Sequence, residues 1–214
     1  MSHSFTIGIF GAGKVGTALA RLGIAAGNSV LVSGSPRHTH TQMLLDVVAP
    51  GAVEAGSAEV MVRASDLVII AVPFAKSDEI DYGLFTGTIV VDAMNYWPAV
   101  DGVVADIERA ELGNSEFIAM RNPRGRWVKS LNHLGYQELA EAAAEGTRGR
   151  LAIGLAGDDG DAKAVVSAWL DDIGFDPVDV GALADGRRLE TGGAIFGRSL
   201  SRGEFALSLG LVES

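Results

Sequence analysis

The 214-residue sequence contains no cysteine, and its negative side chains outnumber its positive ones. Without cysteine the protein forms no disulfide, and it has neither a thiol nucleophile nor a thiolate metal site. Redox chemistry in such a chain has to come from a bound cofactor. The formal net charge of -10 repels phosphate groups. We therefore predict neither nucleic acid nor an anionic membrane as a partner.

Long apolar runs, internal repeats and low-complexity segments are also absent from the sequence. Near the N-terminus, Lys14, Arg21 and several glycines interrupt the apolar residues, a pattern that fits neither a signal peptide nor a membrane span. We therefore expect a cytoplasmic protein. With 48% hydrophobic residues, the chain can bury one large core, or the core of one domain plus a smaller portion.

No arrangement of side chains indicates nucleophilic or metal catalysis. Serine, histidine and aspartate fall into no recognisable triad. The four histidines lack the spacing of zinc ligands. We therefore name no catalytic residue and no metal ligand, and we expect a bound cofactor to act on a small-molecule substrate.

What the sequence does contain is a glycine-rich turn between an apolar strand and a helix. Gly11, Gly13 and Gly16, in TIGIFGAGKVGTALA, have the spacing of a dinucleotide-binding fingerprint. The first glycine permits a tight turn, the second leaves space for a pyrophosphate, and the third lets the helix approach the strand. We predict a dinucleotide site formed by Gly11, Ala12, Gly13, Lys14, Val15 and Gly16. The alternative is a glycine-rich turn without a ligand.

The second predicted strand ends without the acidic residue that binds the ribose hydroxyls of NAD. From position 33 the chain reads SGSPRHTH, and the first carboxylate after the glycine turn is Asp46. Hydroxyl and cationic groups suit the 2′-phosphate of NADP instead. We predict NADP(H) as cofactor, with its phosphate held by Ser33, Ser35, Arg37 and His38. The alternative is ordinary helix capping by Ser35 before Pro36, although a capped helix N-terminus also attracts phosphate.

Strand and helix patterns alternate along the whole chain. Strands are expected near 5–10, at 29–33, near 52–55, at 66–73 and at 88–95, with helices over 15–26 and 42–48 and from position 57. This order predicts a Rossmann-type α/β fold, a doubly wound parallel sheet. Later strands at RWVKSLN, LAIGLAG and FDPVDVG, a helix over 162–173 and a capping box at Ser201 and Glu204 predict a smaller C-terminal α/β portion.

We place the dinucleotide-binding domain at residues 1–120, and the portion that completes the fold and the acceptor side at 121–214. Ligands of such sheets bind beyond the carboxyl ends of the strands. This rule selects Ala71, Val72, Pro73, Phe74, Ala93, Met94 and Asn95 as crevice residues. The Asn95 amide could bind the nicotinamide carboxamide or a ring oxygen, or Asn95 could simply form a turn. For the other crevice residues the alternative is plain loop packing.

Several segments together resemble the NADPH-dependent reductases of the deazaflavin coenzyme F420. They are the GxGxxG opening, GSPRH, IIAVPF, VVDAMN, WVKSLNHLGY, GLAGDD and GFDPVDVGALADGRRLE, spread over nearly the whole chain. The resemblance implies hydride transfer between NADP(H) and a deazaflavin, with coenzyme F420 as co-substrate. Such a transfer requires orientation more than acid or base groups. Two alternatives stay open: an NADPH-dependent reductase of another small acceptor such as a flavin, carbonyl or imine, and a non-catalytic NADP(H)-binding module.

Two features are candidates for the acceptor side. The segment RNPRGRWVK gathers Arg121, Arg124, Arg126 and Lys129 without an acid. Arg124 and Arg126 could bind the phosphate and glutamate tail that the resemblance implies, or they could lie on a solvated loop. His133 either faces the nicotinamide crevice or satisfies a nearby helix start. Because the chain has little room for a substrate domain, we expect a homodimer whose second subunit completes the acceptor site.

Overall fold

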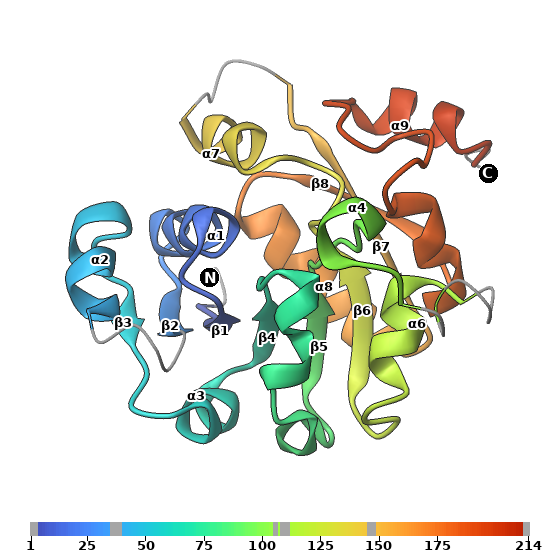
Figure 1. The fold of residues 1–214 in the computed structure, drawn as a ribbon. Helices are drawn as coiled ribbons and strands as arrows, with labels where there is room; N and C mark the ends of the chain where they lie inside the picture. Colours follow the sequence, from blue (N-terminus) through green and yellow to red (C-terminus); the bar gives the residue numbers. More distant parts are fainter. Residues whose placement is uncertain (1–3, 35–39, 105–106, 108–111, 145–148, 212–214) are drawn as a thin grey trace.

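The computed structural model describes residues 4–34, 40–104, 107, 112–144 and 149–211. In this part of the chain, eight strands form one sheet in the order β3-β2-β1-β4-β5-β6-β7-β8 (Figure 1). The strands are β1 (Thr6–Phe10), β2 (Ser29–Ser33), β3 (Val53–Glu54), β4 (Leu67–Ile70), β5 (Ile89–Asp92), β6 (Arg126–Ser130), β7 (Ala152–Gly157) and β8 (Asp176–Gly181). The predicted Rossmann-type α/β fold is confirmed.

Helices cover both faces of the sheet. They are α1 (Lys14–Ala25), α2 (Thr41–Val48), α3 (Ala58–Ala64), α4 (Pro98–Asp101), α6 (Asn114–Ala119), α7 (Tyr136–Ala144), α8 (Gly160–Asp172) and α9 (Arg202–Ser208). One apolar cluster joins the sheet to α1, α2, α7 and α8, and a second joins it to α3 and α6. The central strands β4 and β5 are buried along their whole length, because helices cover them on both sides.

Two stretches differ from the sequence prediction. The apolar run at 66–73 forms a strand only over β4, because the chain then leaves the sheet. The helical stretch expected before β5 consists of two 3₁₀-helices, η1 (Phe74–Glu79) and η2 (Tyr82–Phe85). η1 begins beside the carboxyl end of β4 and therefore borders the crevice that the sequence predicts.

The C-terminal portion extends the same sheet. β6 pairs parallel with β5, but β7 runs antiparallel to β6, so the sheet is not parallel throughout. The 3₁₀-helix η3 (Leu183–Leu189) and α9 follow β8. The predicted capping box begins α9: the Ser201 amide donates to Glu204 Oε2 at 2.9 Å and Ser201 Oγ accepts from the Glu204 amide at 3.4 Å. The domain boundary at 120/121 stays a prediction. Among the described residues, no helix is both long and apolar enough to cross a membrane.

Candidate dinucleotide-binding site

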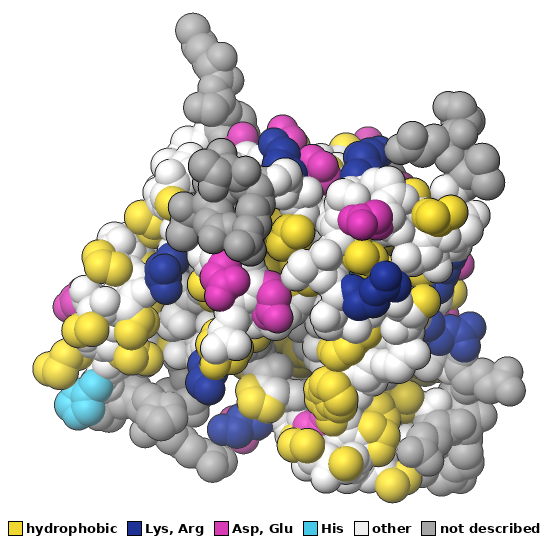
Figure 2. Space-filling view, turned by 90° about the horizontal axis from the view of Figure 1, so that it is seen from above, with side chains coloured by type: hydrophobic (Ala, Val, Ile, Leu, Met, Phe, Trp, Pro, Cys, Tyr) yellow, Lys and Arg dark blue, Asp and Glu magenta, His cyan; other side chains and the backbone are white. Residues whose placement is uncertain are grey.

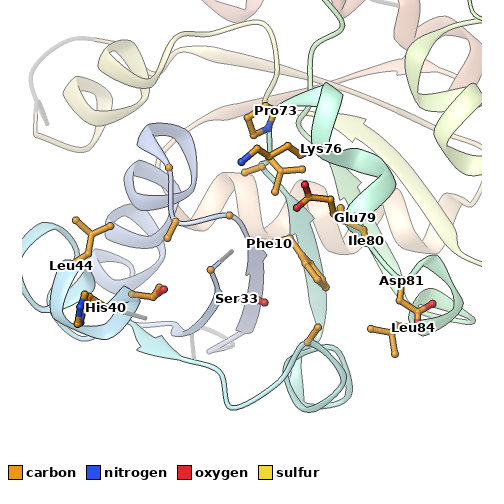
Figure 3. Close-up of a pocket in the computed structure, with 18 residues that line it drawn as sticks. Phe10, Ser33, His40, Leu44, Pro73, Lys76, Glu79, Ile80, Asp81 and Leu84 are labelled. Atoms are coloured by element: carbon orange, nitrogen blue, oxygen red, sulfur yellow. The ribbon is translucent and has the colours of Figure 1, made fainter. Parts of the chain in front are cut away.

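A pocket of about 710 Å³ opens at the carboxyl ends of β1, β2 and β4 (Figure 3). Its walls include three segments that the sequence selects: Gly11, Ala12 and Gly13 after β1, Ser33 at the end of β2, and Ala71, Val72 and Pro73 after β4. Pockets of this size commonly hold small-molecule cofactors. The fold thus brings together segments about sixty residues apart in the sequence, as the rule for doubly wound sheets predicts.

Two glycines of the turn are required by the fold itself. Gly11 has a φ of +111°, and a Cβ there would lie 2.6 Å from the Ala71 carbonyl oxygen. A Cβ at Gly16 would lie 1.9 Å from the Gly11 carbonyl oxygen. Any larger side chain at either position collides with backbone, which cannot move aside cheaply. These two glycines would be needed even if no ligand were bound.

Gly13 is different, because nothing in the fold requires glycine there. Its backbone is extended, with φ -80° and ψ -172°, and a Cβ would meet no atom within 4 Å. Gly13 is exposed and lines the pocket. The space beside it is available to a ligand that approaches the backbone closely, as a pyrophosphate does in dinucleotide-binding turns.

The N-terminus of α1 presents unpaired backbone donors at this place. Gly13 is the N-cap of α1 and makes no side-chain capping bond, and the first turn holds no acidic residue. The first amides of a helix have no intrahelical acceptor, and the helix dipole adds positive potential. A phosphate fits such a terminus. Basic and acidic side chains are interspersed on the described part of the face above the strands (Figure 2), so no patch of one charge attracts an anion there. The backbone amides are therefore the better hydrogen-bond donors to a phosphate.

The side chains of Lys14 and Val15 contact other parts of the protein and do not line the pocket. The Lys14 ammonium donates to the Tyr136 hydroxyl at 3.4 Å and lies 4.9 Å from the centre of that ring, which joins α1 to α7. The Val15 side chain packs against the apolar core. The amides of both residues belong to the first turn of α1, where a phosphate would lie.

The carboxyl end of β2 carries no acid among the described residues. Glu54, at the end of neighbouring β3, does not line the pocket, and its carboxylate accepts the Gln42 amide at 3.0 Å. Ser33 lines the pocket, whereas the predicted phosphate ligands Ser35, Arg37 and His38 lie outside the described residues. This part of the pocket therefore lacks the carboxylate that selects NAD.

Sequence reasoning missed two pocket residues that can carry positive charge. Lys76, on η1, lies near Pro73 in Figure 3, and His40 lies beside Leu44 at the start of α2. Lys76 follows the predicted crevice residue Phe74 by two positions, and a lysine so close to a strand end is a usable signal. His40 ends the segment SGSPRHTH, from which only Ser33, Ser35, Arg37 and His38 are predicted to bind the phosphate.

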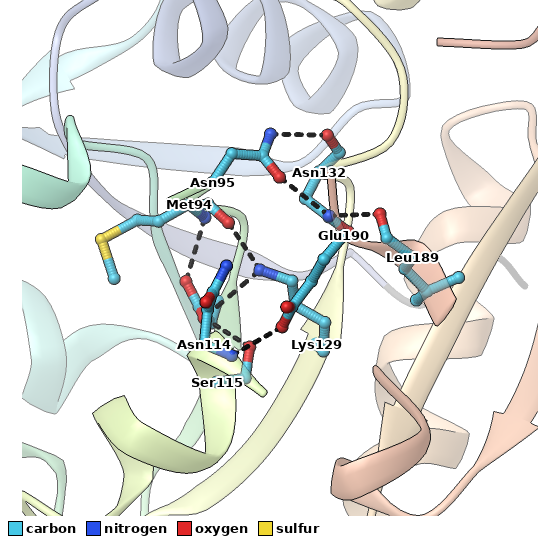
Figure 4. Close-up of polar contacts among 9 residues, drawn as sticks. Met94, Asn95, Asn114, Ser115, Lys129, Asn132, Leu189 and Glu190 are labelled. Carbon is cyan, nitrogen blue, oxygen red and sulfur yellow. Dashed lines mark hydrogen bonds and ion pairs between the residues drawn. The ribbon is translucent and has the colours of Figure 1, made fainter. Parts of the chain in front are cut away.

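Further along the carboxyl edge, Asn95 forms a reciprocal amide pair with the loop after β6. Its Nδ2 donates to the Asn132 carbonyl oxygen at 2.8 Å, and Asn132 Nδ2 donates to Asn95 Oδ1 at 3.0 Å (Figure 4). Asn132 Nδ2 also donates to the Leu189 carbonyl oxygen at 2.6 Å. Ala93 is buried beneath, and its amide donates to the Ile70 carbonyl oxygen at 3.1 Å. Asn95 is thus half-buried and held by the loop after β6, and neither it nor Ala93 lines the pocket.

A buried charged cluster lies next to Asn95. Lys129 on β6 and Asp92 at the end of β5 are 0% and 1% exposed, with Nζ and Oδ2 3.5 Å apart. Asp92 Oδ2 also accepts the Ser115 hydroxyl at 2.5 Å. Glu190, which accepts the Asn114 amide at 2.7 Å, is close enough to Lys129 to feel its charge. Burial raises the pKa of Glu190 above its usual value, and the Lys129 charge opposes that rise.

This cluster corrects the interpretation of Lys129 as part of a basic surface patch. Lys129 occupies a position on a strand that is buried over Trp127, Val128, Lys129 and Ser130. A strand covered on both faces buries its polar residues as well as its apolar ones. The short run WVKS does not reveal this by itself, because lysine is almost always exposed in folded proteins.

His133 does not line the pocket. It is 1% exposed, its Nε2 accepts the Gly154 amide of β7 at 3.1 Å, and its ring packs on Phe205 of α9 with 5.4 Å between ring centres. The His133 side chain therefore binds the backbone of a strand rather than the start of a helix. Burial lowers the pKa of His133 to about 4. Its predicted role at the acceptor stays a prediction.

Arg124 and Arg126 lie at the opposite edge of the sheet from the glycine turn. Arg126 is the first residue of β6 and pairs in register with Ile89, the first residue of β5. Its guanidinium donates to both carboxylate oxygens of Asp159, at 2.6 and 3.0 Å, and this contact holds the pKa of Asp159 well below its usual range. The structure does not bring the two arginines together with the pocket, and their predicted acceptor role stays a prediction.

Comparison with known proteins supports the prediction of an NADP-binding segment in the N-terminal half. The sequence model of the family described as "NADP oxidoreductase coenzyme F420-dependent" matches residues 6–96. This segment contains the glycine turn, β2, the segment after β4 and Asn95. No curated protein matches the chain.

Two solved structures match over nearly the full length of both chains. A hypothetical protein from Sinorhizobium meliloti is 29% identical with a TM-score of 0.74, and the match covers 92% of this chain and 96% of that one. A protein from Arthrobacter sp. FB24, named for a proposed F420-dependent NADP reductase activity, is 21% identical with a TM-score of 0.74 and coverages of 93% and 100%.

An imine reductase from Pseudomonas sp. shares the fold over a smaller part of its length. It is 23% identical with a TM-score of 0.57, and the match covers 86% of this chain but 58% of that one. At this identity the likeness concerns the fold alone. Residues 6–96, which carry the glycine turn and the crevice, thus match the family of coenzyme F420-dependent NADP oxidoreductases, and the likeness over the rest of the chain is one of fold.

Proposed function

We propose that the protein transfers a hydride between NADP(H) and a deazaflavin, coenzyme F420, or an acceptor of similar chemistry. The observation that carries the cofactor part is Gly13, an exposed glycine at a helix N-terminus that lines a 710 Å³ pocket and that neither packing nor backbone conformation requires. The deazaflavin as acceptor rests on the family match and on the sequence resemblance.

Each part of the cofactor would be bound by a different group of residues. The amides of Gly13, Lys14 and Val15 would bind the pyrophosphate at the α1 terminus. Ser33, together with Ser35, Arg37 and His38, would bind the 2′-phosphate, since the end of β2 offers no carboxylate to a free ribose. The remaining predicted contacts, from Ala71 to Pro73 and at Ala93 and Asn95, would flank the nicotinamide.

When bound, NADP(H) supplies the hydride, and the protein supplies orientation. Ala71, Val72 and Pro73 after β4 give the pocket an apolar wall, and the Asn95–Asn132 amide pair would hold the backbone beside the nicotinamide. Direct hydride transfer gains most from such positioning of the two reactants. We therefore assign no catalytic residue. The second subunit of a homodimer would complete the acceptor side, and light scattering at micromolar concentration tests that state.

The decisive assay mixes the protein with NADPH and oxidised F420 and follows the visible absorbance of the deazaflavin, with NADH in a parallel reaction. Bleaching with NADPH, and much slower bleaching with NADH, is the expected result. Protein that binds NADPH but does not bleach F420 would refute the deazaflavin acceptor. Screening flavins, carbonyls and imines would then separate a reductase of another acceptor from a non-catalytic binding module.

A further inference from the structure

The lysine at the centre of the buried cluster has a specific set of contacts. Its ammonium donates to the Met94 carbonyl oxygen at 2.5 Å and faces Asp92 Oδ2 at 3.5 Å. Its stem is covered by η3, where a Cβ on Gly186 would lie 3.0 Å from Lys129 Cβ. The ammonium is thus enclosed by β5, β6 and η3, with no exposed surface.

Stability alone does not explain a charge at this place. Moving an ammonium and a carboxylate out of water is costly, and well-packed apolar residues often replace a buried ion pair without loss of stability. The benefit that a buried pair does provide is a defined geometry, because its partners must meet at fixed positions. The backbone groups that Lys129 and Asp92 hold at fixed positions therefore indicate what the pair is for.

Together they hold both backbone groups of Met94. Asp92 Oδ1 accepts the Met94 amide at 2.9 Å, and the Lys129 ammonium binds the Met94 carbonyl oxygen. The peptide that leads into Asn95 therefore has a fixed direction. Asn95 meets Asn132, which follows Leu131, a residue with a φ of +64° and the one non-glycine with positive φ among the described residues. Backbone in this region is strained and persists only where surrounding contacts enforce it.

We propose that Lys129 is a positioning residue for the nicotinamide end of the dinucleotide. Its ammonium fixes the Met94 carbonyl, and through it the backbone at Asn95, just beyond the carboxyl end of β5. This inference rests on the proposed function, because it needs a dinucleotide whose nicotinamide lies at Asn95. It predicts that, without the ammonium, the nicotinamide ring of bound NADPH is held less rigidly, while the adenosine end binds as in the wild type.

The test compares Lys129→Met with Lys163→Met. Lys163 makes the same two kinds of contact at a distance from the crevice: its Nζ binds Asp179 Oδ1 at 3.0 Å and the Gly181 carbonyl oxygen at 3.1 Å. Two ligands are titrated into each protein. The first is 2′,5′-ADP, which contains only the adenosine end, and the second is NADPH, whose nicotinamide fluorescence rises when the ring is immobilised.

In Lys129→Met we expect the NADPH fluorescence gain to fall by at least about half, while the 2′,5′-ADP dissociation constant stays within about twofold. Lys163→Met should change neither. A Lys129→Met protein with wild-type fluorescence gain, or with equal loss of both ligands, would overturn the inference. If the wild-type protein binds neither ligand, the proposed function fails and this inference fails with it. A failure confined to Lys129→Met leaves the proposed function standing.

If Lys129→Met does not fold, Lys129→Gln decides the question. Glutamine keeps a donor in the cluster, but its side chain is one bond shorter and loses the Met94 contact. The expected result is again a reduced NADPH fluorescence gain with unchanged 2′,5′-ADP affinity. Wild-type fluorescence in this variant would overturn the inference.

Discussion

The glycine turn and the buried cluster around Lys129 lie along the same edge of one sheet, yet they are built in opposite ways. The turn leaves backbone amides without protein partners and leaves Gly13 exposed. The cluster encloses its charges completely and pairs Lys129 with Asp92 and the Met94 carbonyl. Open donors suit the binding of a ligand that arrives from solution, whereas satisfied ones suit the maintenance of a shape.

The largest expected effect comes from Gly16→Ala, which tests the turn as a structural element. A Cβ at this position would lie 1.9 Å from the Gly11 carbonyl oxygen, so α1 has to move away from the strand. We expect a loss of about 3 kcal/mol or more in unfolding free energy, together with loss of NADPH binding. Urea denaturation measures the first and calorimetry the second. Wild-type stability would show that the turn is less tightly packed than the structure indicates.

A pH titration tests the buried loop after β6 through His133. Its folded pKa of about 4 lies below its ordinary value of 6.5. The unfolded state therefore binds the proton first as the pH falls. Stability is complete above pH 6.5, decreases as the pH falls toward 4, and changes no further through this group below that. The expected loss is about 3 kcal/mol, from about 2.5 pKa units at 1.36 kcal/mol each.

The control for this prediction is His133→Gln, which can still accept the Gly154 amide but does not titrate in this range. Its unfolding free energy should vary less between pH 6.5 and 4 than that of the wild type. The comparison also removes the contribution of Glu190, whose raised pKa acts in the opposite sense and is present in both proteins. Parallel pH profiles of the two proteins would contradict the assignment to His133.

Gly13→Ala tests whether glycine at position 13 is needed for ligand binding rather than for folding. A methyl group there meets no protein atom within 4 Å. We expect the unfolding free energy to change by less than about 1 kcal/mol, because a weaker N-cap and a less flexible unfolded chain have opposite effects. NADPH affinity should fall about 10- to 100-fold, since the methyl group occupies space that the pyrophosphate needs. Calorimetry measures the dissociation constant.

Gly160→Ala is the matched control, because Gly160 begins α8 and is equally open, with no atom within 4 Å of a Cβ. Its NADPH affinity should equal that of the wild type, and its unfolding free energy should rise by less than about 1 kcal/mol, because alanine is less flexible than glycine in the unfolded chain. If Gly13→Ala binds NADPH as tightly as Gly160→Ala does, the glycine turn does not contact the pyrophosphate.

The smallest expected effect is that of replacing Arg124 and Arg126 together by alanine. Their place at the amino edge of the sheet, with Arg126 bound to Asp159, puts them far from the pocket. We expect the KM for the acceptor to stay within about twofold, since screening weakens charge effects over such a distance. Steady-state kinetics with F420 measures it. A clear rise in KM would support the sequence-based prediction of an anion-binding patch.

The sequence by itself determined the fold class and the place of the glycine turn, because both depend on local patterns. Strand and helix periodicity predicted β1, β2, α1 and the C-terminal strands, and the capping box predicted the start of α9. The spacing of Gly11, Gly13 and Gly16 identified the turn without any knowledge of its surroundings.

Only the tertiary structure decided that the fold requires Gly11 and Gly16, whereas Gly13 is open to a ligand. It also moved Lys129 from an expected surface patch to a buried cluster, directed His133 toward β7 and α9, and placed Arg126 at the far edge. Each of these outcomes depends on residues distant in the sequence, such as Met94 for Lys129 and Gly154 for His133. Burial and partners are properties of the packed sheet, and a local pattern does not contain them.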